Sequence, residues 1–484
     1  MNKLPYKKIY FVGIKGVGMA SLAVIAKQAG YEVRGSDVSD SFITDSLLSI
    51  LSISVDSGFE KSDIQAFIDS GIKSTLVIVT AAHEGLNNPQ AVYAKEHASD
   101  VVTFGQALGM FQYGTLLNRQ DILGVSVAGS HGKTTTTAML ASALSNLGED
   151  PSYLVGTSDI GALGQPGKYG KGKYFVVESD EYVSDLIHDP VPKFHYQHPY
   201  AAIITNIDFD HPDVFSSIED IYHAFRVFIQ NIQQEGILIV NSDDKSFEHI
   251  QHAVRDDIKL ITIGESSECV YNARNISITE EGITYSVFNR EEKLGEIKVS
   301  VIGKHNVLNS LSVVALLHTM GKSFSEIAES LQSFSGTKRR LELKGVTSSG
   351  QIVIDDYAHH PTEISATLDA LKQAYPDKKI VCIFQPHTYS RTQSLVNEFA
   401  SSLKKADILL LLPIFTSARE NAITEAQQKQ LYDQILDESQ GVFLETQENV
   451  VEYCVQNLVA NQYIIVTMGA GNVYKISEKL LGYN

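Results

Sequence analysis

The segment VAGSHGKTTTT, from Val127 to Thr137, has the residue types that bind nucleotide phosphates. Gly129 and Gly132 let the backbone approach the phosphates closely. Lys133 can reach the terminal phosphates, and the Thr134 hydroxyl can join a magnesium shell. Two residues separate the glycines, whereas the usual P-loop has four. A strand is expected before the loop and a helix after it, which directs the positive N-terminal end of the helix at the phosphates. The segment predicts a nucleoside triphosphate site.

Two clusters of oxygen ligands follow predicted buried strands of the same region. Glu178-Ser-Asp180-Glu181 follows YFVV, and Asn206, Asp208, Asp210 and His211 follow YAAIIT. Oxygen ligands suit magnesium, which needs only one or two carboxylates. Each cluster alone is as well explained by a solvated loop. Together with the phosphate loop, they predict a magnesium–ATP site.

A second glycine turn, Gly13-Ile-Lys-Gly16-Val-Gly18, joins a predicted strand to a predicted helix. Its N–H groups can point at a diphosphate, and Asp37, about twenty residues on, can bind a ribose. The spacing is Gly-x-x-Gly-x-Gly, so a nucleotide diphosphate is favoured and NAD is not specifically indicated. The alternative is a turn that only lets the strand and the helix pack.

Histidine, arginine and amide side chains cluster in the second half of the chain. They lie in Gly303–Asn309, Lys338–Arg340, Asp355–Pro361 and Pro386–Arg391. Histidine and arginine near carboxylates suit an anionic substrate or a transferred phosphoryl group. Zinc is not predicted, because the adjacent His359 and His360 would seldom share one ion and no third ligand is evident. His195 and His198 are expected to be ordinary polar surface or loop residues.

Alternating strands and helices must position these groups. The pattern of apolar strand, glycine turn and helix starts near residue 8, again near 120 and a third time after SGTKRRLELKG. This pattern predicts an α/β protein with doubly wound, mostly parallel sheets, whose ligands lie at strand carboxyl ends. We expect three domains, at residues 1–118, 119–334 and 335–484.

Composition narrows the class of protein. The chain has 484 residues, of which 43% are hydrophobic and 20% charged, and its formal net charge is −18. That charge disfavours nucleic acid and anionic membranes as partners. No window reaches the roughly 18 apolar residues of a membrane span, and the N-terminus is interpreted as a strand and not a signal peptide. Cys269, Cys382 and Cys454 are expected to be reduced, buried thiols. We expect a cytoplasmic protein, either a monomer or a homodimer.

These motifs together resemble the Mur ligase family over essentially the whole chain. GIKGVGMASLA is similar to the family's uridine-nucleotide turn, AGSHGKTTTT to its ATP loop and HNVLNSL to its adenine-side motif. DDYAHHPTEI and QPHTYSRT are similar to its C-terminal motifs. The resemblance implies three α/β domains: a Rossmann-like UDP-binding domain, a P-loop-type ATPase domain and a Rossmann-like C-terminal domain.

The resemblance also implies a peptidoglycan-precursor ligase that uses ATP and Mg²⁺. ATP would phosphorylate the carboxylate of UDP-N-acetylmuramate, and the amine of L-alanine would then attack the acyl phosphate. The implied catalytic residues are Lys133, Glu178, His211 and Arg340, with Thr134, Glu178 and His211 as the metal ligands. The implied ATP-binding residues are Gly129, Ser130, His131, Gly132, Lys133, Thr134, Thr135, His305, Asn306, Asn309 and Asp356. The implied substrate-binding residues are Gly16, Gly18 and Asp37 for UDP, Glu181, and Tyr357, His359, His387 and Arg391 for the amino acid.

Three features depart from the L-alanine-specific members of the family. Lys15 replaces a glycine, although an added cation could suit a diphosphate, and Thr388 replaces an arginine that would contact a carboxylate. The segment from Asp180 through KFHY to DFDHPDVF is closer to a related ligase that attaches a murein tripeptide to the same sugar nucleotide. The C-terminal signature of that related ligase, however, lacks the His…Tyr-Ser-Arg-Thr run present here at His387–Thr392. L-alanine is therefore the first interpretation and the tripeptide the second.

Two other classes of protein explain less of the sequence. An oxidoreductase accounts only for the first glycine turn, and a non-catalytic nucleotide-binding module would turn over no ATP. A ligase whose residues come from several domains must close around its substrates, and the hinge is expected near Ser335-Gly336.

Overall fold

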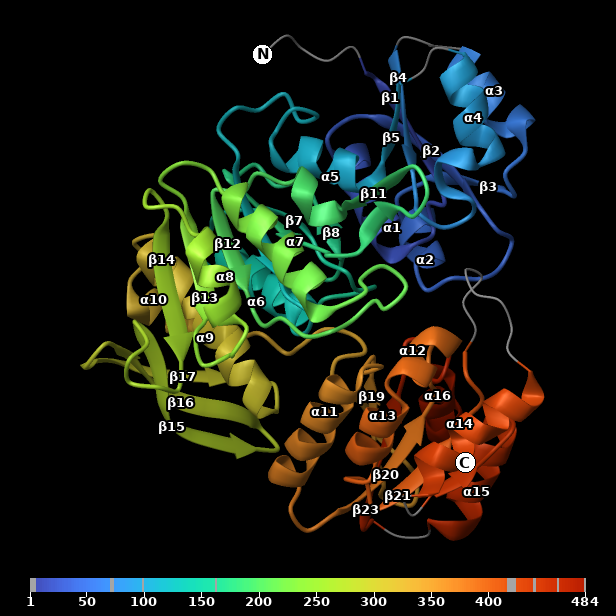
Figure 1. The fold of residues 1–484 in the computed structure, drawn as a ribbon, viewed down its shortest axis with the longest axis vertical. Helices are drawn as coiled ribbons and strands as arrows, with labels where there is room; N and C mark the ends of the chain where they lie inside the picture. Colours follow the sequence, from blue (N-terminus) through green and yellow to red (C-terminus); the bar gives the residue numbers. More distant parts are fainter. Residues whose placement is uncertain are drawn as a thin grey trace.

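The computed structural model describes residues 6–69, 74–97, 100–161, 163–415, 424–437, 441–458 and 461–482. Its main sheets have five, ten and six strands, and they follow one another along the chain (Figure 1). The three-domain α/β prediction is therefore confirmed. The predicted boundaries near residues 118 and 334 fall between the sheets, and we retain them as a proposal.

The first sheet has the order β3-β2-β1-β4-β5, and all its strands are parallel. Four of the five residues of β1 are buried, as expected for a strand covered on both faces. Gly13 has a φ of 82°, which lets the chain turn directly from β1 into α1. The elements are β1 (Lys8–Val12), α1 (Val17–Gln28), β2 (Glu32–Asp37), α2 (Asp45–Ile50), β3 (Ser54–Ser57), α3 (Lys61–Asp69), β4 (Thr75–Val79), α4 (Pro89–Glu96), β5 (Asp100–Thr103) and α5 (Phe104–Gln112).

The central sheet has the order β17-β16-β15-β14-β13-β12-β6-β9-β7-β8. The strands from β7 through β9, β6, β12, β13 and β14 to β15 pair in parallel, and β8, β16 and β17 pair antiparallel with their neighbours. The strands are β6 (Leu123–Ala128), β7 (Ser152–Leu154), β8 (Gly167–Lys168), β9 (Tyr174–Glu178), β12 (Ala201–Ile204), β13 (Ile237–Asn241), β14 (Lys259–Gly264), β15 (Tyr271–Thr279), β16 (Gly282–Asn289) and β17 (Glu292–Val299).

The helices of the central domain include the one that follows the phosphate loop. They are α6 (Lys133–Asn146), α7 (Ile218–Gln230), α8 (Phe247–Ile250), α9 (Lys304–Thr319) and α10 (Phe324–Gln332). A separate hairpin, β10 (Val183–Asp185) with β11 (Asp189–Pro192), runs into the 3₁₀ turn η3 (Lys193–Tyr196).

The third sheet has the order β18-β19-β23-β20-β21-β22, with β18 as its antiparallel edge. Its elements are β18 (Glu342–Val346), β19 (Ile352–Asp356), α11 (Pro361–Ala374), β20 (Lys379–Phe384), α12 (Tyr389–Ser394), α13 (Val396–Leu403), β21 (Ile408–Leu411), α14 (Glu425–Asp437), β22 (Gly441–Phe443), α15 (Gln447–Asn457), β23 (Tyr463–Met468) and α16 (Tyr474–Gly482). This domain, orange to red in Figure 1, faces the central domain through α11, which contacts α9 and β15.

The apolar cores join the domains unequally. Leu154, Phe175 and Val177 of the central sheet belong to the same buried cluster as Ile9 and Phe11 of the first. The third domain has its own buried clusters, and Ile302 is the member that the central domain contributes among the described residues. The first and central domains therefore share a core, whereas the third is largely self-contained.

All three cysteines are buried and free, as predicted. Within the described ranges, no helix combines the length and the apolar character needed to cross a bilayer.

Candidate functional site

Two cavities contain most of the residues singled out in the sequence. The first, the three-domain cavity, has a volume of about 420 Å³ and is lined from all three domains by Gly16, Gly18, Ser130, Gly132, Lys133, Thr134, Glu178, His211, Arg340, Tyr357 and His359, among others. The second, the two-domain cavity, has a volume of about 570 Å³ and lies between the central and third domains. It is lined by His131, Gly132, Thr135, His305, Asn306, Asn309, Arg340 and Asp356, among others. Asp37, Gly129, Glu181, His387 and Arg391 line neither cavity.

The phosphate loop is shaped by the strand that lies beside it. Gly129 and Gly132 both have positive φ, and a Cβ on Gly132 would lie 2.7 Å from Oδ1 of Asn309. The N–H of Ser130 donates to the carbonyl of Asn206, and the N–H of His131 donates to the Asn206 side chain, both at 2.9 Å. The short glycine spacing therefore belongs to a fully formed loop.

Lys133 lies at the first position of α6, and an acidic partner holds it there. Its Nζ is 2.9 Å from a carboxylate oxygen of Glu181, and it also donates to the carbonyl of Gly129. Burial opposes the charge on Lys133, but Glu181 and neighbouring carboxylates outweigh that effect and raise the pKa of the lysine to about 12. Lys133 is thus a fixed cation beside the cavity.

The predicted metal ligands lie in two adjacent groups. The Thr134 hydroxyl donates to Glu178 at 2.9 Å, and the other oxygen of Glu178 accepts from the N–H of Gly156. His211, at a φ of 59°, brings its Nε2 to 3.9 Å from Glu181. Ligand atoms of Asp180, Glu181 and His211 all lie within 4.8 Å of one another. A hydroxyl, carboxylates and one imidazole at a water-accessible cavity fit Mg²⁺, which retains several waters.

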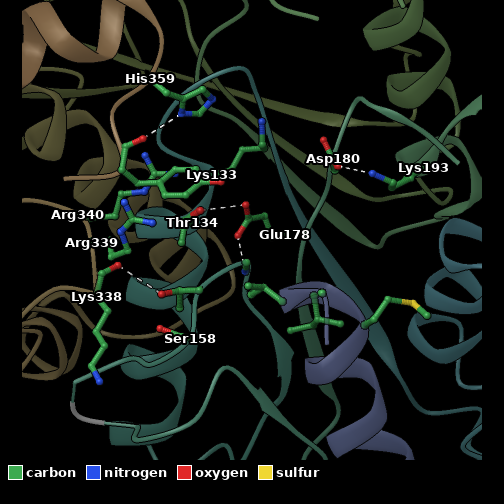
Figure 2. A pocket seen from close by; sticks show the side chains of 18 of the residues that line it. Lys133, Thr134, Ser158, Glu178, Asp180, Lys193, Lys338, Arg339, Arg340 and His359 are labelled. Atoms are coloured by element: carbon green, nitrogen blue, oxygen red, sulfur yellow. Dashed lines mark hydrogen bonds and ion pairs between the residues drawn. The ribbon is translucent and has the colours of Figure 1, made fainter. Parts of the chain in front are cut away.

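The third domain closes the site from the opposite side. Figure 2 shows Arg340 and His359 facing Lys133, Thr134 and Glu178 across the three-domain cavity. Arg340 lies over the ring of Tyr357, at 5.2 Å from the ring centroid. Lys133 and Arg340, about two hundred positions apart in the sequence, therefore line one cavity.

Glu363, in the first turn of α11, connects these groups and was not predicted from the sequence. One of its oxygens lies 3.3 Å from Nη1 of Arg340 and 3.5 Å from Nδ1 of His131, and the other accepts from the N–H of His359. Glu363 lines both cavities. His360 caps α11, and Glu363 lies in the first turn that follows. Because acidic residues favour the first turn of a helix, this position was the sequence signal that could have identified Glu363.

Asp356 is buried and His305 is half-buried at the two-domain cavity. Asp356 accepts from the N–H groups of Leu341 and Ala358, so its carboxylate holds the backbone around it. Burial raises the pKa of Asp356 to about 6, with Arg340 opposing the shift. Burial also lowers the pKa of His305 to about 4, so this imidazole is neutral. A neutral imidazole and the amides of Asn306 and Asn309 suit an uncharged heterocycle on this side.

The predicted amino-acid pocket differs from expectation in one contact. Arg391 does not present a free guanidinium, because it pairs with Asp210 of the central domain. His387 lies 6.2 Å from His359, measured between ring centroids. Thr388 has a φ of 68°, a conformation that costs a β-branched residue about 1–3 kcal/mol and is typical of functional sites.

The uridine-side turn also differs in detail. Asp37 is buried and accepts from the N–H of Lys15 at 2.7 Å, so it fixes the turn and lines neither cavity. The suggestion that Lys15 adds a cation for a diphosphate is not supported, because its ammonium donates to the carbonyl of Asp40 and pairs with Asp45.

The remaining histidines behave differently from one another. His359 faces Glu363, whereas His360 faces the Phe209 carbonyl and Asp208, so the adjacent histidines do not share a partner. The structure also forms a group of possible ligands that the sequence did not predict, since ligand atoms of His131, Asp208 and His360 lie within 4.8 Å of one another. His198 is exposed as expected, but His195 is half-buried, bonds to the Ala224 carbonyl and stacks on Phe194.

Comparison with known proteins places this site in a family. Residues 8–112 match the Mur ligase family catalytic domain, residues 127–317 the Mur ligase middle domain, and residues 339–471 the Mur ligase glutamate ligase domain. The chain is 36% identical to a UDP-N-acetylmuramate–L-alanine ligase of Caldanaerobacter subterraneus, over 99% of this chain and 98% of that protein. It is 37% identical to the enzyme of that name from Streptococcus gordonii, over 98% of each.

Solved structures show the same relationship. The crystal structure of the UDP-N-acetylmuramate-alanine ligase MurC from Thermotoga maritima has a TM-score of 0.77 and 26% identity, over 98% of each chain. A murein peptide ligase from Psychrobacter arcticus has a TM-score of 0.70 and 25% identity, also over 98% of each chain.

The fold and the site together define a nucleotide-dependent ligase built from three α/β domains. The chain belongs to the Mur ligase family, and it is an ATP-dependent ligase.

Proposed function

We propose that this enzyme joins L-alanine to the carboxylate of UDP-N-acetylmuramate, with hydrolysis of ATP to ADP and phosphate, in peptidoglycan precursor synthesis. The observation that carries the proposal is the three-domain cavity. It brings the glycine turn of the first domain, the phosphate loop and Arg340 of the third domain to one space. The tripeptide alternative is not favoured, because full-length relatives at 34–37% identity are L-alanine ligases.

The first half-reaction requires the γ-phosphate of ATP to meet the muramoyl carboxylate. A carboxylate oxygen attacks the γ-phosphorus, the bond to ADP breaks, and an acyl phosphate forms. Lys133 and Arg340, which line the cavity from the central and third domains, would neutralise charge on the phosphoryl group as it moves. Catalysis then depends mainly on positioning, for which the close fit of the loop around Asn206 is suited.

Thr134, Glu178 and His211 would hold Mg²⁺, which when bound neutralises charge on the ATP phosphates. Glu178 is oriented for this role by the N–H of Gly156, which fixes one of its oxygens. Glu181 would position Lys133 and would meet the substrate only after that lysine turns toward phosphate.

The second half-reaction brings in the amine. The ammonium of L-alanine first loses a proton to solvent, and the free amine attacks the carbonyl carbon of the acyl phosphate. The tetrahedral intermediate loses a second proton from nitrogen to solvent, and phosphate leaves to give the amide. Tyr357 and His359 face the three-domain cavity, and His387 lies next to His359. Arg391 would pair with the L-alanine carboxylate once Asp210 releases it or shares it. The proposal includes Gly129, Ser130, His131 and Thr135 as the rest of the ATP loop, and a cytoplasmic location.

One assay tests the proposal. Purified enzyme is incubated with ATP, Mg²⁺ and UDP-N-acetylmuramate, and either L-alanine, glycine, L-serine or murein tripeptide is added. Phosphate release and product mass are recorded, with a Lys133→Met variant as the control. Rapid ADP formation with L-alanine is expected. The proposal fails if no amine stimulates ADP release, and its acceptor is wrong if the tripeptide is strongly preferred.

A further inference from the structure

Lys193, at the first position of η3, lines the three-domain cavity and has no role in the site described so far. Its Nζ lies 2.6 Å from Oδ2 of Asp180, which lines the same cavity. Figure 2 shows this pair on the side of the cavity opposite Arg340, with Lys133 between them. The Lys193 side chain is only 15% exposed, whereas that of Asp180 is 38% exposed. The ammonium is therefore largely desolvated and borders a space large enough for a ligand.

A chain of close contacts connects Lys193 to the uridine-side glycine turn. Gly18 packs against Phe104, since a Cβ on Gly18 would lie 3.0 Å from that ring. Gly105, which follows Phe104 in the chain, packs against Lys193, since a Cβ on Gly105 would lie 3.1 Å from Cα of Lys193. Gly105 therefore permits a direct approach of the first domain to the backbone of Lys193. The lysine lies along the wall that runs from the predicted diphosphate site toward Lys133.

The hairpin before Lys193 fixes this position. Asp185 on β10 accepts from the N–H of Leu86, and Asp189 on β11 accepts from the Thr103 hydroxyl, both across to the first domain. The N–H of Lys193 donates to the carbonyl of Tyr182, and its ammonium lies 5.1 Å from the centroid of that ring. The hairpin thus carries a central-domain cation to the first domain.

The other cations that line the cavity do not account for the negative charges of the sugar nucleotide. Apart from Lys133 and Lys193, its lysines and arginines come from the segment Lys338–Arg340 of the third domain. Arg339 is held by the buried Asp355, and Lys338 is half exposed and pairs with Asp159, while Lys133 and Arg340 face the ATP phosphates in the proposed function. A sugar nucleotide with a diphosphate and a carboxylate brings about three negative charges. The glycine turn itself offers no cation, since Lys15 turns away from it.

We infer that Lys193 binds an anionic oxygen of the sugar nucleotide, and that Asp180 occupies its ammonium when the substrate is absent. The oxygen belongs either to the diphosphate or to the muramoyl carboxylate, which share this chemistry. An incoming anion replaces Asp180 as the partner of the ammonium, and Asp180, whose side chain is 38% exposed, is then solvated by water. This inference rests on the proposed function for the identity of the substrate.

Titration calorimetry tests it on the full-length enzyme, with UDP, UDP-N-acetylglucosamine and UDP-N-acetylmuramate as probes. Each titration is run without ATP and again with Mg²⁺ and a non-hydrolysable ATP analogue. Lys193→Met is expected to weaken UDP-N-acetylmuramate binding by about 10- to 100-fold, the effect of losing one charge-assisted hydrogen bond. Lys193→Arg is expected to stay within about 5-fold of wild type, because it keeps the charge.

The three probes separate the two sources of the anionic oxygen. Weaker binding of all three to Lys193→Met assigns the lysine to the diphosphate, which they share. Weaker binding of UDP-N-acetylmuramate alone assigns it to the carboxylate, which the other two lack.

Two further variants exclude a merely structural role. Asp180→Asn is expected to bind UDP-N-acetylmuramate at least as tightly as wild type, because it removes the competing anion. Lys168→Met is the matched control, since Lys168 pairs with Asp150 at the same 2.6 Å but lines neither cavity. Thermal unfolding confirms that each variant is folded.

The inference is overturned if Lys193→Met binds all three nucleotides like Lys168→Met, or if Asp180→Asn weakens binding as much as Lys193→Met does. If the wild-type enzyme itself binds no uridine nucleotide, the proposed function fails together with the role of Lys193. Wild-type binding with an unaffected Lys193→Met variant contradicts only the role of Lys193.

Discussion

Arg391 of the third domain and Asp210 of the central domain form a buried ion pair, with 2.8 Å between Nη2 and Oδ1. Both side chains are 8% exposed. The pair therefore occupies the guanidinium that the sequence assigned to the amino-acid carboxylate. Separating a buried ion pair leaves each charge without a partner, which is costly. The carboxylate of the substrate must therefore replace Asp210 as the partner of Arg391.

Replacing Arg391 with methionine is expected to raise the KM for L-alanine by about 10- to 100-fold, because a charge-assisted contact is lost. The KM for ATP is expected to change by less than about threefold, since Arg391 lines neither nucleotide cavity. Steady-state kinetics with each substrate varied in turn measures both. Arg391→Lys, which keeps the charge without the planar fork, should fall between. An unchanged KM for L-alanine would remove Arg391 from the amino-acid pocket.

Replacing Glu363 with glutamine is expected to weaken the binding of both ATP and L-alanine and to lower kcat, which steady-state kinetics measures. This carboxylate contacts Arg340, His131 and His359, which border both cavities. We expect kcat to fall by about 10- to 100-fold, the effect of misplacing groups that must be positioned for reaction. Glu326→Gln is a suitable control, because Glu326 also lies in the first turn of a helix but caps α10 at the surface. A Glu363→Gln variant with normal kinetics would show that its contacts are only structural.

His131 predicts a specific dependence of stability on pH. Burial opposes its charge, but hydrogen bonds to Asp208 and Glu363 outweigh burial and raise the pKa of the imidazole to about 9. Since that value lies above about 6.5 for the unfolded chain, the stabilisation is fully present below pH 6.5 and is lost as the pH rises through 9. The difference in free energy of unfolding between wild type and His131→Gln should therefore shrink from pH 6.5 to 9.5. Denaturant unfolding at several pH values measures it, and a constant difference would contradict the raised pKa.

The pair of Lys133 and Glu181 separates stability from activity. Lys133→Met should abolish turnover and lower the free energy of unfolding by about 2–3 kcal/mol, because Glu181 is left buried without its cation. The double variant Lys133→Met/Glu181→Gln should recover much of that stability but no activity. Thermal unfolding and phosphate release measure the two effects. Recovery of activity in the double variant would show that Lys133 only neutralises Glu181.

Glu178 and His211 are predicted to hold magnesium. Glu178→Gln and His211→Ala should each raise the Mg²⁺ concentration needed for half-maximal activity, since each removes a ligand. Magnesium titrations at saturating ATP measure this concentration. His223→Ala, a change on the surface of α7 outside both cavities, is the control. If neither ligand variant shifts the requirement, the assignment is wrong.

Local patterns in the sequence predicted the strands and the loops at their ends. The run YFVVESDE became β9 followed by its carboxylates, and KIYFVGI became β1 followed by a turn at Gly13. Such strands can be predicted from the sequence because a strand covered on both faces is apolar along nearly its whole length. The antiparallel strands β15–β17 were missed, since their alternating, partly exposed residues carry a weaker signal.

The missing parts of the site are those made by contacts between distant segments. Asp210 and Arg391 are 181 positions apart, and Glu363 meets His131 across more than two hundred. No spacing rule connects such residues, so the sequence supplied Arg391 without its partner. Lys193 was passed over for the same reason, because only the docking of its hairpin on the first domain brings it to the cavity.

The interface between the first and central domains differs in chemistry from the interface between the central and third domains. Leu154, Phe175 and Val177 join the first and central domains by hydrophobic contact, which added salt does not weaken. The third domain meets the central domain through charged pairs, of which Arg391–Asp210 is buried and Lys338–Asp159 is partly exposed. Since ions screen exposed charges but not apolar surface, ionic strength acts on the exposed pairs of this interface and leaves the shared core unchanged. Added salt should therefore weaken the exposed contacts between the third and central domains, while the shared apolar core keeps the uridine side of the site assembled.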